Sequence, residues 1–325
     1  MAWRPEFPRE TVWVAAIAQL AGESLESIAD VEQPDEESRG APSGNYRVCM
    51  PIQRLMVLLL LILSVVGLAL AQDNYEIQVY ASEIVPPKTT MVEIHSNFTV
   101  NGSKAVTDGV QPSNHAMHET LELTQGFTDW FETGFYVFST IQPNGGWQWV
   151  GDHIRPRIAV PGKWNWPVGL SLSQEIGYVR PSFAVDTWTY ELRPIIDKKA
   201  GRWYFAFNPT FDRSLHGQSV TKGWEFSPNV KISYDFTKKI TGGIEYYGNM
   251  GPATEFDPIS QQQHQIFPTI DLNLSPKWEF NFGVGWGLTP ATDHLIVKCI
   301  IGRRFSWSHD HSAKLEGLED PVPGR

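Results

Sequence analysis

Cysteine is nearly absent from the sequence, which contains only Cys49 and Cys299. Two cysteines allow at most one disulfide, so a small fold held together by several disulfides is excluded. Cys49 also precedes the one long apolar run of the chain, whereas the cysteine of a lipoprotein anchor follows such a run. The fold must therefore be stable without a framework of cross-links.

Basic residues are also scarce. The 26 lysines and arginines are outnumbered by 36 aspartates and glutamates, so the chain lacks the basic surface that binds nucleic acid. The stretch "GVGWG" is not a phosphate loop, because it lies inside an alternating strand with no helix after it. We therefore expect neither nucleic acid nor a cofactor as a partner.

A catalytic constellation is missing as well. His95 and Ser96 are neighbours, and neighbouring residues of a strand point to opposite faces, so they cannot act together as base and nucleophile. No other serine comes with an obvious base. The sequence predicts that the chain is not an enzyme, with a lipid-modifying outer-membrane enzyme kept as an alternative.

The one long apolar run lies near the start, in "MPIQRLMVLLLLILSVVGLALAQD". It combines the cationic Arg54, an apolar core over about Leu55–Leu70, and an Ala-x-Ala cleavage site before Gln72. These features predict a signal peptide over residues 50–71, although the length of the core leaves an uncleaved anchor open. Either translation starts at Met50, or residues 1–49 are removed with the signal.

Export without a disulfide or a lipid anchor suggests the periplasm or the outer membrane of a Gram-negative cell. After the signal we expect a periplasmic N-terminal segment over residues 72–90 and a barrel over residues 91–305. Residues 306–325 are polar and have no pattern, which predicts a disordered periplasmic tail. His309 and His311 lie on this tail and could bind a metal, but two histidines on a flexible tail more often bind none, so we expect no metal site.

Alternation of apolar and polar residues dominates the chain after the signal, and no helical period is sustained. The alternating runs are mostly about nine to thirteen residues long, where a globular strand has about five or six and a tilted membrane strand about nine to eleven. They predict about twelve strands: Met91–Val100, Met117–Gly126, Phe131–Ser139, Trp149–Val160, Pro167–Val179, Asp186–Asp197, Gly201–Arg213, Trp224–Phe236, Ile240–Gly248, His264–Leu274, Lys277–Gly287 and His294–Phe305.

Five prolines fall inside these predicted strands, where proline cannot donate to the ladder of hydrogen bonds. We expect each of them to mark a bulge or a local opening near a rim: Pro156, Pro194, Pro209, Pro228 and Pro268.

The connections between the strands alternate in size. "VNGSKAVTDGVQPSNHA", "TIQPNGGWQ" and "YGNMGPATEFDPISQQQ" are long and rich in turn formers, whereas "FTDW", "PGKWNW" and "TKK" are short. Long extracellular loops alternating with short periplasmic turns are typical of transmembrane barrels, and a soluble sandwich has no reason to keep that order. The sequence therefore predicts a single all-β transmembrane antiparallel barrel of about twelve strands.

The two faces of each strand differ. In "KWEFNFGVGWGL", residues 277–288, bulky side chains fall on even numbers and small or polar ones on odd numbers. In a membrane barrel the bulky face contacts lipid and the polar face lines the lumen. The predicted lipid-facing residues of this strand are Trp278, Phe280, Phe282, Val284 and Trp286. The predicted lumen-lining residues, as candidates for a constriction, are Glu93, His153, Arg155, Arg157, Glu191, Arg193, Lys231, Glu245, Glu279, Lys298 and Arg304.

Inward charges decide whether a barrel of this size conducts. Arg155 and Arg157 share a face with His153, and Glu191 shares one with Arg193. Such charges either form the constriction of a passive or semi-selective channel for small solutes, or pair into a salt-bridged plug of a structural barrel. Inward aromatic residues likewise either offer a patch to hydrophobic or aromatic solutes or fill space: Tyr136, Phe138, Tyr204, Tyr247 and Phe267.

A family resemblance rests on several stretches, among them "EIQVYASEI", "GFTDWFETGFYV", "GRWYFAFNPTFD", "WEFNFGVGWGLT" and "LIVKCIIGRRF". From Tyr75 to Phe305 the chain resembles bacterial outer-membrane barrel proteins of the transporter type, often labelled phenol-degradation MetA-pathway proteins. The resemblance implies a barrel surrounded by outer-membrane lipid. It also implies recognition by the barrel assembly machinery through the last strand, which ends at Phe305. It does not identify the solute.

Overall fold

The computed structural model describes residues 74–307, which form an all-β fold. Residues 1–73 and 308–325 lie outside the described range, and with them the predicted signal peptide, the segment before it, and nearly all of the predicted tail. The described strands are β1 (Thr89–Asn101), β2 (Met117–Gly126), β3 (Phe131–Gln142), β4 (Gly146–Ala159), β5 (Gly169–Val179), β6 (Asp186–Ala200), β7 (Trp203–Gly217), β8 (Trp224–Asp235), β9 (Ile240–Asn249), β10 (Gln263–Leu272), β11 (Trp278–Gly287) and β12 (Leu295–Ser306).

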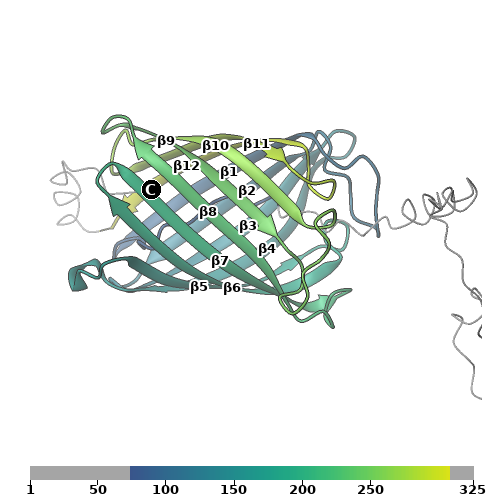
Figure 1. The fold of residues 1–325 in the computed structure, drawn as a ribbon, viewed down its shortest axis with the longest axis horizontal. Coiled ribbons are helices and arrows are strands. Elements are labelled where there is room, and N and C mark those ends of the chain that lie inside the picture. The colour runs from purple at the N-terminus through teal and green to yellow at the C-terminus, as the bar shows by residue number, and fades with distance from the viewer. Residues whose placement is uncertain (1–73, 308–325) are drawn as a thin grey trace, which may run out of the picture. The chain divides into compact units, whose positions relative to one another are not determined.

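These twelve strands close into one antiparallel barrel (Figure 1). Each strand pairs with its neighbours in sequence, and β1 completes the ring by pairing with β12 from Thr89 opposite Ser306 to Asn101 opposite Leu295. Closure gives every strand two hydrogen-bonded neighbours, so no sheet edge is left open. The fold class and the strand number predicted from the sequence are confirmed. Among the described residues, no helix is long and apolar enough to cross a membrane.

The barrel has two unlike ends. We call the end where Thr89 pairs with Ser306 the turn end, and the opposite end the loop end. The connections at the turn end are residues 127–130, 160–168, 201–202, 236–239 and 273–277. Those at the loop end are residues 102–116, 143–145, 180–185, 218–223, 250–262 and 288–294.

Two connections differ in length from the prediction. The stretch "TIQPNGGWQ", expected to be a long loop, is reduced to residues 143–145 because β3 and β4 extend into it. The stretch "PGKWNW", expected to be a short turn, belongs to the longer connection 160–168, which contains the 3-10 helix η1 (Gly162–Trp164). The remaining connections keep the predicted contrast between the two ends.

Side chains alternate between the outer surface and the interior. On β11 the exposed fractions of Trp278, Phe282 and Trp286 are 38%, 49% and 46%, whereas the intervening Asn281 is buried. The same alternation runs along β7 and β10. The bulky face is therefore the outside of this barrel and the polar face its inside, which is the arrangement of a membrane barrel and the reverse of a soluble core.

Prolines interrupt the strand ladders. Pairing stops around Pro156 between β4 and β5, around Pro194 between β6 and β7, and around Pro268 between β10 and β11. Pro209 and Pro228 lie opposite each other on β7 and β8. Pro156 lies three residues before the end of β4, near the turn end. The other four prolines lie well inside their strands and not near the rims as predicted, partly because strands such as β6 and β7 run past their predicted ends.

The interior of the barrel is occupied by the residues that precede β1. We call residues 74–88 the inner segment. Its Ile77, Val79 and Tyr80 are buried inside the barrel, although the outer surface of the same barrel exposes large apolar side chains. The sequence predicts a periplasmic N-terminal segment over residues 72–90. In the structure residues 74–88 of that range lie in the lumen, where their apolar side chains are shielded from water, and β1 begins at Thr89.

Candidate functional site

The inner segment crosses the lumen from one end to the other. Asn74 lies at the loop end, where its Nδ2 donates to Asp293 Oδ2 (2.7 Å) in the connection before β12. Near the turn end, the Val85 N–H donates to Glu132 Oε2 (2.5 Å). The inner segment and β1 therefore run in opposite directions, and the segment fills the length of the lumen.

Wall side chains hold the main chain of the inner segment at its centre. Asn208 on β7 accepts from the Tyr80 N–H (2.7 Å) and donates to the Tyr80 carbonyl (3.1 Å). Arg157 on β4 donates to the carbonyls of Ala81 (3.1 Å) and Glu83 (2.6 Å). One wall side chain thus binds two main-chain groups in each case, which fixes both position and direction.

Two further wall residues extend these contacts toward the ends. Asp197 on β6 accepts from the Ser82 N–H (2.7 Å) and from the Ser82 hydroxyl (2.8 Å). Lys298 on β12 donates to the Ile77 carbonyl (3.0 Å). At the junction with β1, the Lys88 N–H donates to the Gly126 carbonyl (3.1 Å) and the Lys88 carbonyl accepts from the Trp307 N–H (3.0 Å). Residues 74–87 belong to no strand of the described barrel, and wall side chains hold them in place.

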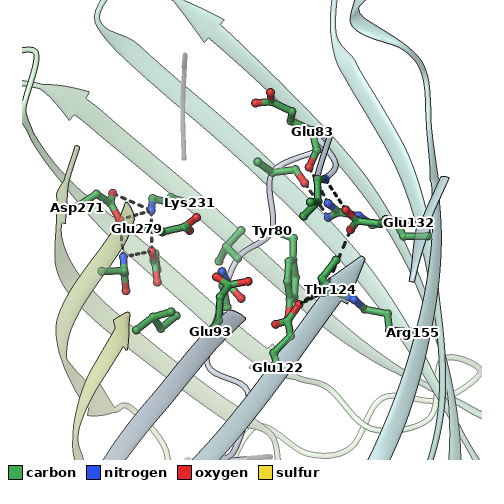
Figure 2. Close-up of a pocket in the computed structure, with 18 of the residues that line it drawn as sticks. Tyr80, Glu83, Glu93, Glu122, Thr124, Glu132, Arg155, Lys231, Asp271 and Glu279 are labelled. Atoms are coloured by element: carbon green, nitrogen blue, oxygen red, sulfur yellow. Dashed lines mark hydrogen bonds and ion pairs between the residues drawn. The ribbon is translucent and has the colours of Figure 1, made fainter. Parts of the chain in front are cut away.

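The ring of Tyr80 lies between two guanidinium groups. Arg155 on β4 is 4.5 Å and Arg193 on β6 is 4.8 Å from the ring centroid, within the range of cation–π attraction. The Tyr80 hydroxyl contacts Glu76 of the same segment, and Glu76 lies 3.6 Å from Arg193. Figure 2 shows Tyr80 in the interior, beside Arg155 and Glu122 of the wall.

Burial changes the acidity of the inner segment. It raises the pKa of Glu76 from 4.5 to about 7, with Arg193 opposing the shift and Glu191 adding to it. Burial also raises the pKa of Tyr80, and the nearby charge of Glu76 adds to that shift. Tyr80 is therefore neutral, and Glu76 titrates near neutral pH.

The apolar side chains of the inner segment pack into two clusters. Ile77 and Val79 pack with Tyr204, Ala206, Tyr247, Phe267 and Ile296 of the wall. Tyr75 packs nearer the loop end with Tyr136, Phe138 and Val150. All five inward aromatic residues singled out from the sequence belong to these clusters. In this closed structure they fill the space around the inner segment.

One ionic network lies on β1 to β4. Arg155 pairs with Glu122 (2.8 Å), Arg157 pairs with Glu132 (2.7 Å), and His95 Nε2 lies 3.5 Å from Glu122. All of these side chains are buried, so each charge depends on its partner. The predicted Arg155 and Arg157 are thus neutralised by wall carboxylates and also touch the inner segment.

A second ionic network lies on the opposite wall, on β8 to β12. Lys231 binds Asp271 (2.9 Å) and Glu245 (3.1 Å), and the fully buried Lys298 binds Glu245 from the other side. Asn281 donates to Asp271 (2.6 Å). Lys298 joins this network to the inner segment, because the same ammonium group binds the Ile77 carbonyl.

The other predicted lumen residues also face the interior. Six side chains form the pairs His153 with Glu175, Arg193 with Glu191, and Arg304 with Glu279. Glu93 is buried and lines the cavity described below. Asn208 was not among the lumen residues predicted from the sequence, because it is a neutral side chain among many charged ones. Its position between Phe207 and Pro209, in the inward phase of β7, was the available signal.

A small cavity remains between the inner segment and the wall (Figure 2). The space that water centres can reach is about 50 Å³, which holds a few water molecules at roughly 10–15 Å³ each. Small-molecule sites occupy about 300 Å³ or more. Carboxylates outnumber cations among the lining side chains. This cavity is too small for an organic solute of ordinary size.

Comparison with known proteins adds little. No protein-family model and no curated protein matches the chain, so the resemblance to MetA-pathway barrels stays a prediction. Among solved structures, the chain is similar to a NanC porin (8% identity, TM-score 0.44, 66% of this chain and 99% of that one). It is also similar to a KdgM porin in complex with disordered oligogalacturonate (13%, 0.40, 67% and 99%). LpxR from Salmonella typhimurium is another (10%, 0.34, 66% and 99%). At these TM-scores the likenesses carry no argument about function.

Proposed function

We propose that this chain is an outer-membrane channel for small solutes whose lumen is held closed by its own inner segment. The outward face supports a membrane location, because a belt of exposed Trp, Phe and Ile side chains suits lipid and not water. The predicted signal peptide fits export to that membrane. In this proposal Trp278, Phe282 and Trp286 contact lipid, and the predicted transporter type remains part of the hypothesis.

One observation carries the proposal. The segment that fills the lumen is not one of the strands of the wall. Side chains from both halves of the barrel attach it, and strand pairing does not. Each neutral hydrogen bond of this kind contributes about 0.5–1.5 kcal/mol, and each charged one about 1.5–3 kcal/mol. The segment can therefore leave while the ring of twelve strands stays intact.

A structural barrel is the second candidate, and the two ionic networks favour it. They brace opposite walls, and the charges of both networks are paired, as in a plug that never opens. The lumen of such a barrel would stay closed whatever happened to the inner segment. A lipid-modifying enzyme gains no support from the contacts of His95, whose ring faces Glu122 inside the lumen while the Ser96 hydroxyl binds Glu119.

Planar-bilayer recording separates the two candidates. Ile77→Asp places a carboxylate in the apolar cluster with Val79 and Phe267, which should release the segment and produce conductance steps that are rare in wild type. The matched control is Ile259→Asp, the same change at a position that is 73% exposed in a loop. Heat-dependent mobility on gels checks that both barrels fold. A folded Ile77→Asp chain that never conducts would remove the channel and leave the structural barrel.

A further inference from the structure

The wall binds the inner segment largely through groups that every peptide has. Besides the contacts of Asn208, Arg157, Asp197 and Lys298, the Asn97 amide donates to the Asn74 carbonyl (2.8 Å). The Thr120 hydroxyl donates to the Tyr75 carbonyl (2.7 Å). Along the lumen, the main-chain N–H and C=O groups of the inner segment therefore form hydrogen bonds with side chains from β1, β2, β4, β6, β7 and β12.

The side chains of the inner segment alternate as in an extended strand. Ile77 and Val79 face the apolar cluster formed by β7, β9, β10 and β12. Glu76 and Tyr80 face the arginines of β4 and β6 on the other side. The lumen therefore offers one apolar wall and one charged wall to an extended chain whose side chains alternate with a period of two.

We infer that the lumen is a binding site for an extended peptide, and that the inner segment occupies this site as an intramolecular ligand. Peptides are then the substrate class of the channel, so the inference rests on the proposed function and deepens it. A peptide with an acidic residue four positions before an aromatic one, and apolar residues between them, reproduces the side-chain contacts of Glu76, Ile77, Val79 and Tyr80.

The chemistry of the contacts favours a peptide over a saccharide. Asn208 binds the N–H and the C=O of one residue at the same time, which is the pairing that amides offer to an amide. A saccharide carries hydroxyl groups but no branched apolar side chain to fill the space between Tyr204, Tyr247 and Phe267. That space is fully buried, so a ligand that left it empty would lose the contacts made by Ile77 and Val79.

The test uses the full chain with its own segment weakened. In planar bilayers, Ile77→Asp supplies open channels, and a synthetic peptide with the sequence of residues 74–86, NYEIQVYASEIVP, is added in solution. We expect the peptide to reduce the open probability in a concentration-dependent way. The comparison peptide carries N-methyl groups on the residues matching Tyr80, Ser82 and Val85, which removes the donors to Asn208, Asp197 and Glu132. Its block should be weaker by about tenfold or more.

The outcomes separate the two proposals. If Ile77→Asp folds but does not conduct, the channel itself fails. If it conducts and the unmodified peptide blocks no better than the N-methylated one, the channel stands and the peptide site is overturned. Block by a linear oligosaccharide of similar length, but not by the peptide, also overturns it. Tyr80→Gly serves as a second host chain, since it weakens the segment by removing the ring between Arg155 and Arg193.

Discussion

Asn208 and Tyr80 form a two-point contact in the centre of the barrel: the buried Asn208 amide accepts from the Tyr80 N–H at 2.7 Å and donates to the Tyr80 carbonyl at 3.1 Å. Asn208 belongs to the wall and Tyr80 to the inner segment. Both main-chain groups lie where water has little access, so each depends on this one side chain. The pair therefore couples the wall to the segment at the centre of the barrel.

Asn208→Ala should open the channel. The change leaves two buried main-chain groups of Tyr80 without their partner, at about 1–3 kcal/mol for each. The docked state of the inner segment loses stability, so the open probability in planar bilayers should rise by about tenfold or more. Asn229→Ala is the matched control, because Asn229 lies on the neighbouring strand and donates to Thr210, not to the segment. Equal open probabilities in the two folded variants would contradict the coupling.

The strands of the barrel wall could be predicted from the sequence, because alternation with a period of two depends only on the local geometry of a strand. In Trp224–Phe236 and Lys277–Gly287 the alternation alone separates the outward face from the inward one, and the structure keeps that phase. The stretch "EIQVYASEI" of the inner segment alternates as well, but this alternation does not indicate which parts of the protein its two faces contact. Asn208, Lys298 and Asp197 are far apart in sequence and converge on the segment only when the barrel closes. Its place in the lumen was therefore not predictable from the segment itself.

Lys298→Met should destabilise the barrel. Lys298 is fully buried between Glu245, the Ile77 carbonyl and the Tyr247 hydroxyl, and its removal leaves part of the Glu245 charge unpaired. Breaking a buried pair from one side costs about 3–5 kcal/mol, and the low end applies because Lys231 still binds Glu245. The free energy of unfolding, followed by heat-dependent gel mobility in urea, should fall accordingly.

The double change Lys298→Met with Glu245→Gln should recover part of this loss, because no carboxylate is then left short of a partner. The surface control is Lys163→Met, which removes an exposed pair with Asp129 and should change the free energy by no more than about 1 kcal/mol. A loss at Lys298 as small as the loss at Lys163 would show that the buried network does not brace the barrel.

Raising the pH should open the channel through Glu76. Its pKa is about 7 in the docked segment and 4.5 in its ordinary range, so docking holds a proton that the released segment gives up. The contribution of this proton to the stability of the docked segment is complete below about pH 4.5 and is lost as the pH rises through about 7. Burial is the main cause of the raised pKa, and the groups that face Glu76 are Arg193 and Glu191 on β6, Arg155 on β4 and Tyr80 of the inner segment. Open probability should rise as the pH increases from about 4.5 to about 7, the interval between the two pKa values.

Glu76→Gln isolates that effect, because glutamine keeps the size of the side chain and does not titrate. The open probability of this variant should be nearly flat over the same range, while its absolute value reports the loss of the contact with Arg193. A pH response that persists unchanged in Glu76→Gln would assign the titration to another group.

Gly285→Ala should reduce stability because Gly285 makes room for a side chain from the next strand. A Cβ at this position would lie 2.2 Å from the ring of Phe267, which is fully buried and packs with Ile77 and Val79. Overpacking of this kind costs about 1–3 kcal/mol, measured as a lower free energy of unfolding. Adding Phe267→Leu to Gly285→Ala should restore part of the loss, because the shorter side chain vacates the space of the methyl group. Gly162→Ala is the control, since a Cβ there meets nothing within 4 Å. If Gly285→Ala and Gly162→Ala are equally stable, the close approach of Phe267 does not constrain the inward face of β11.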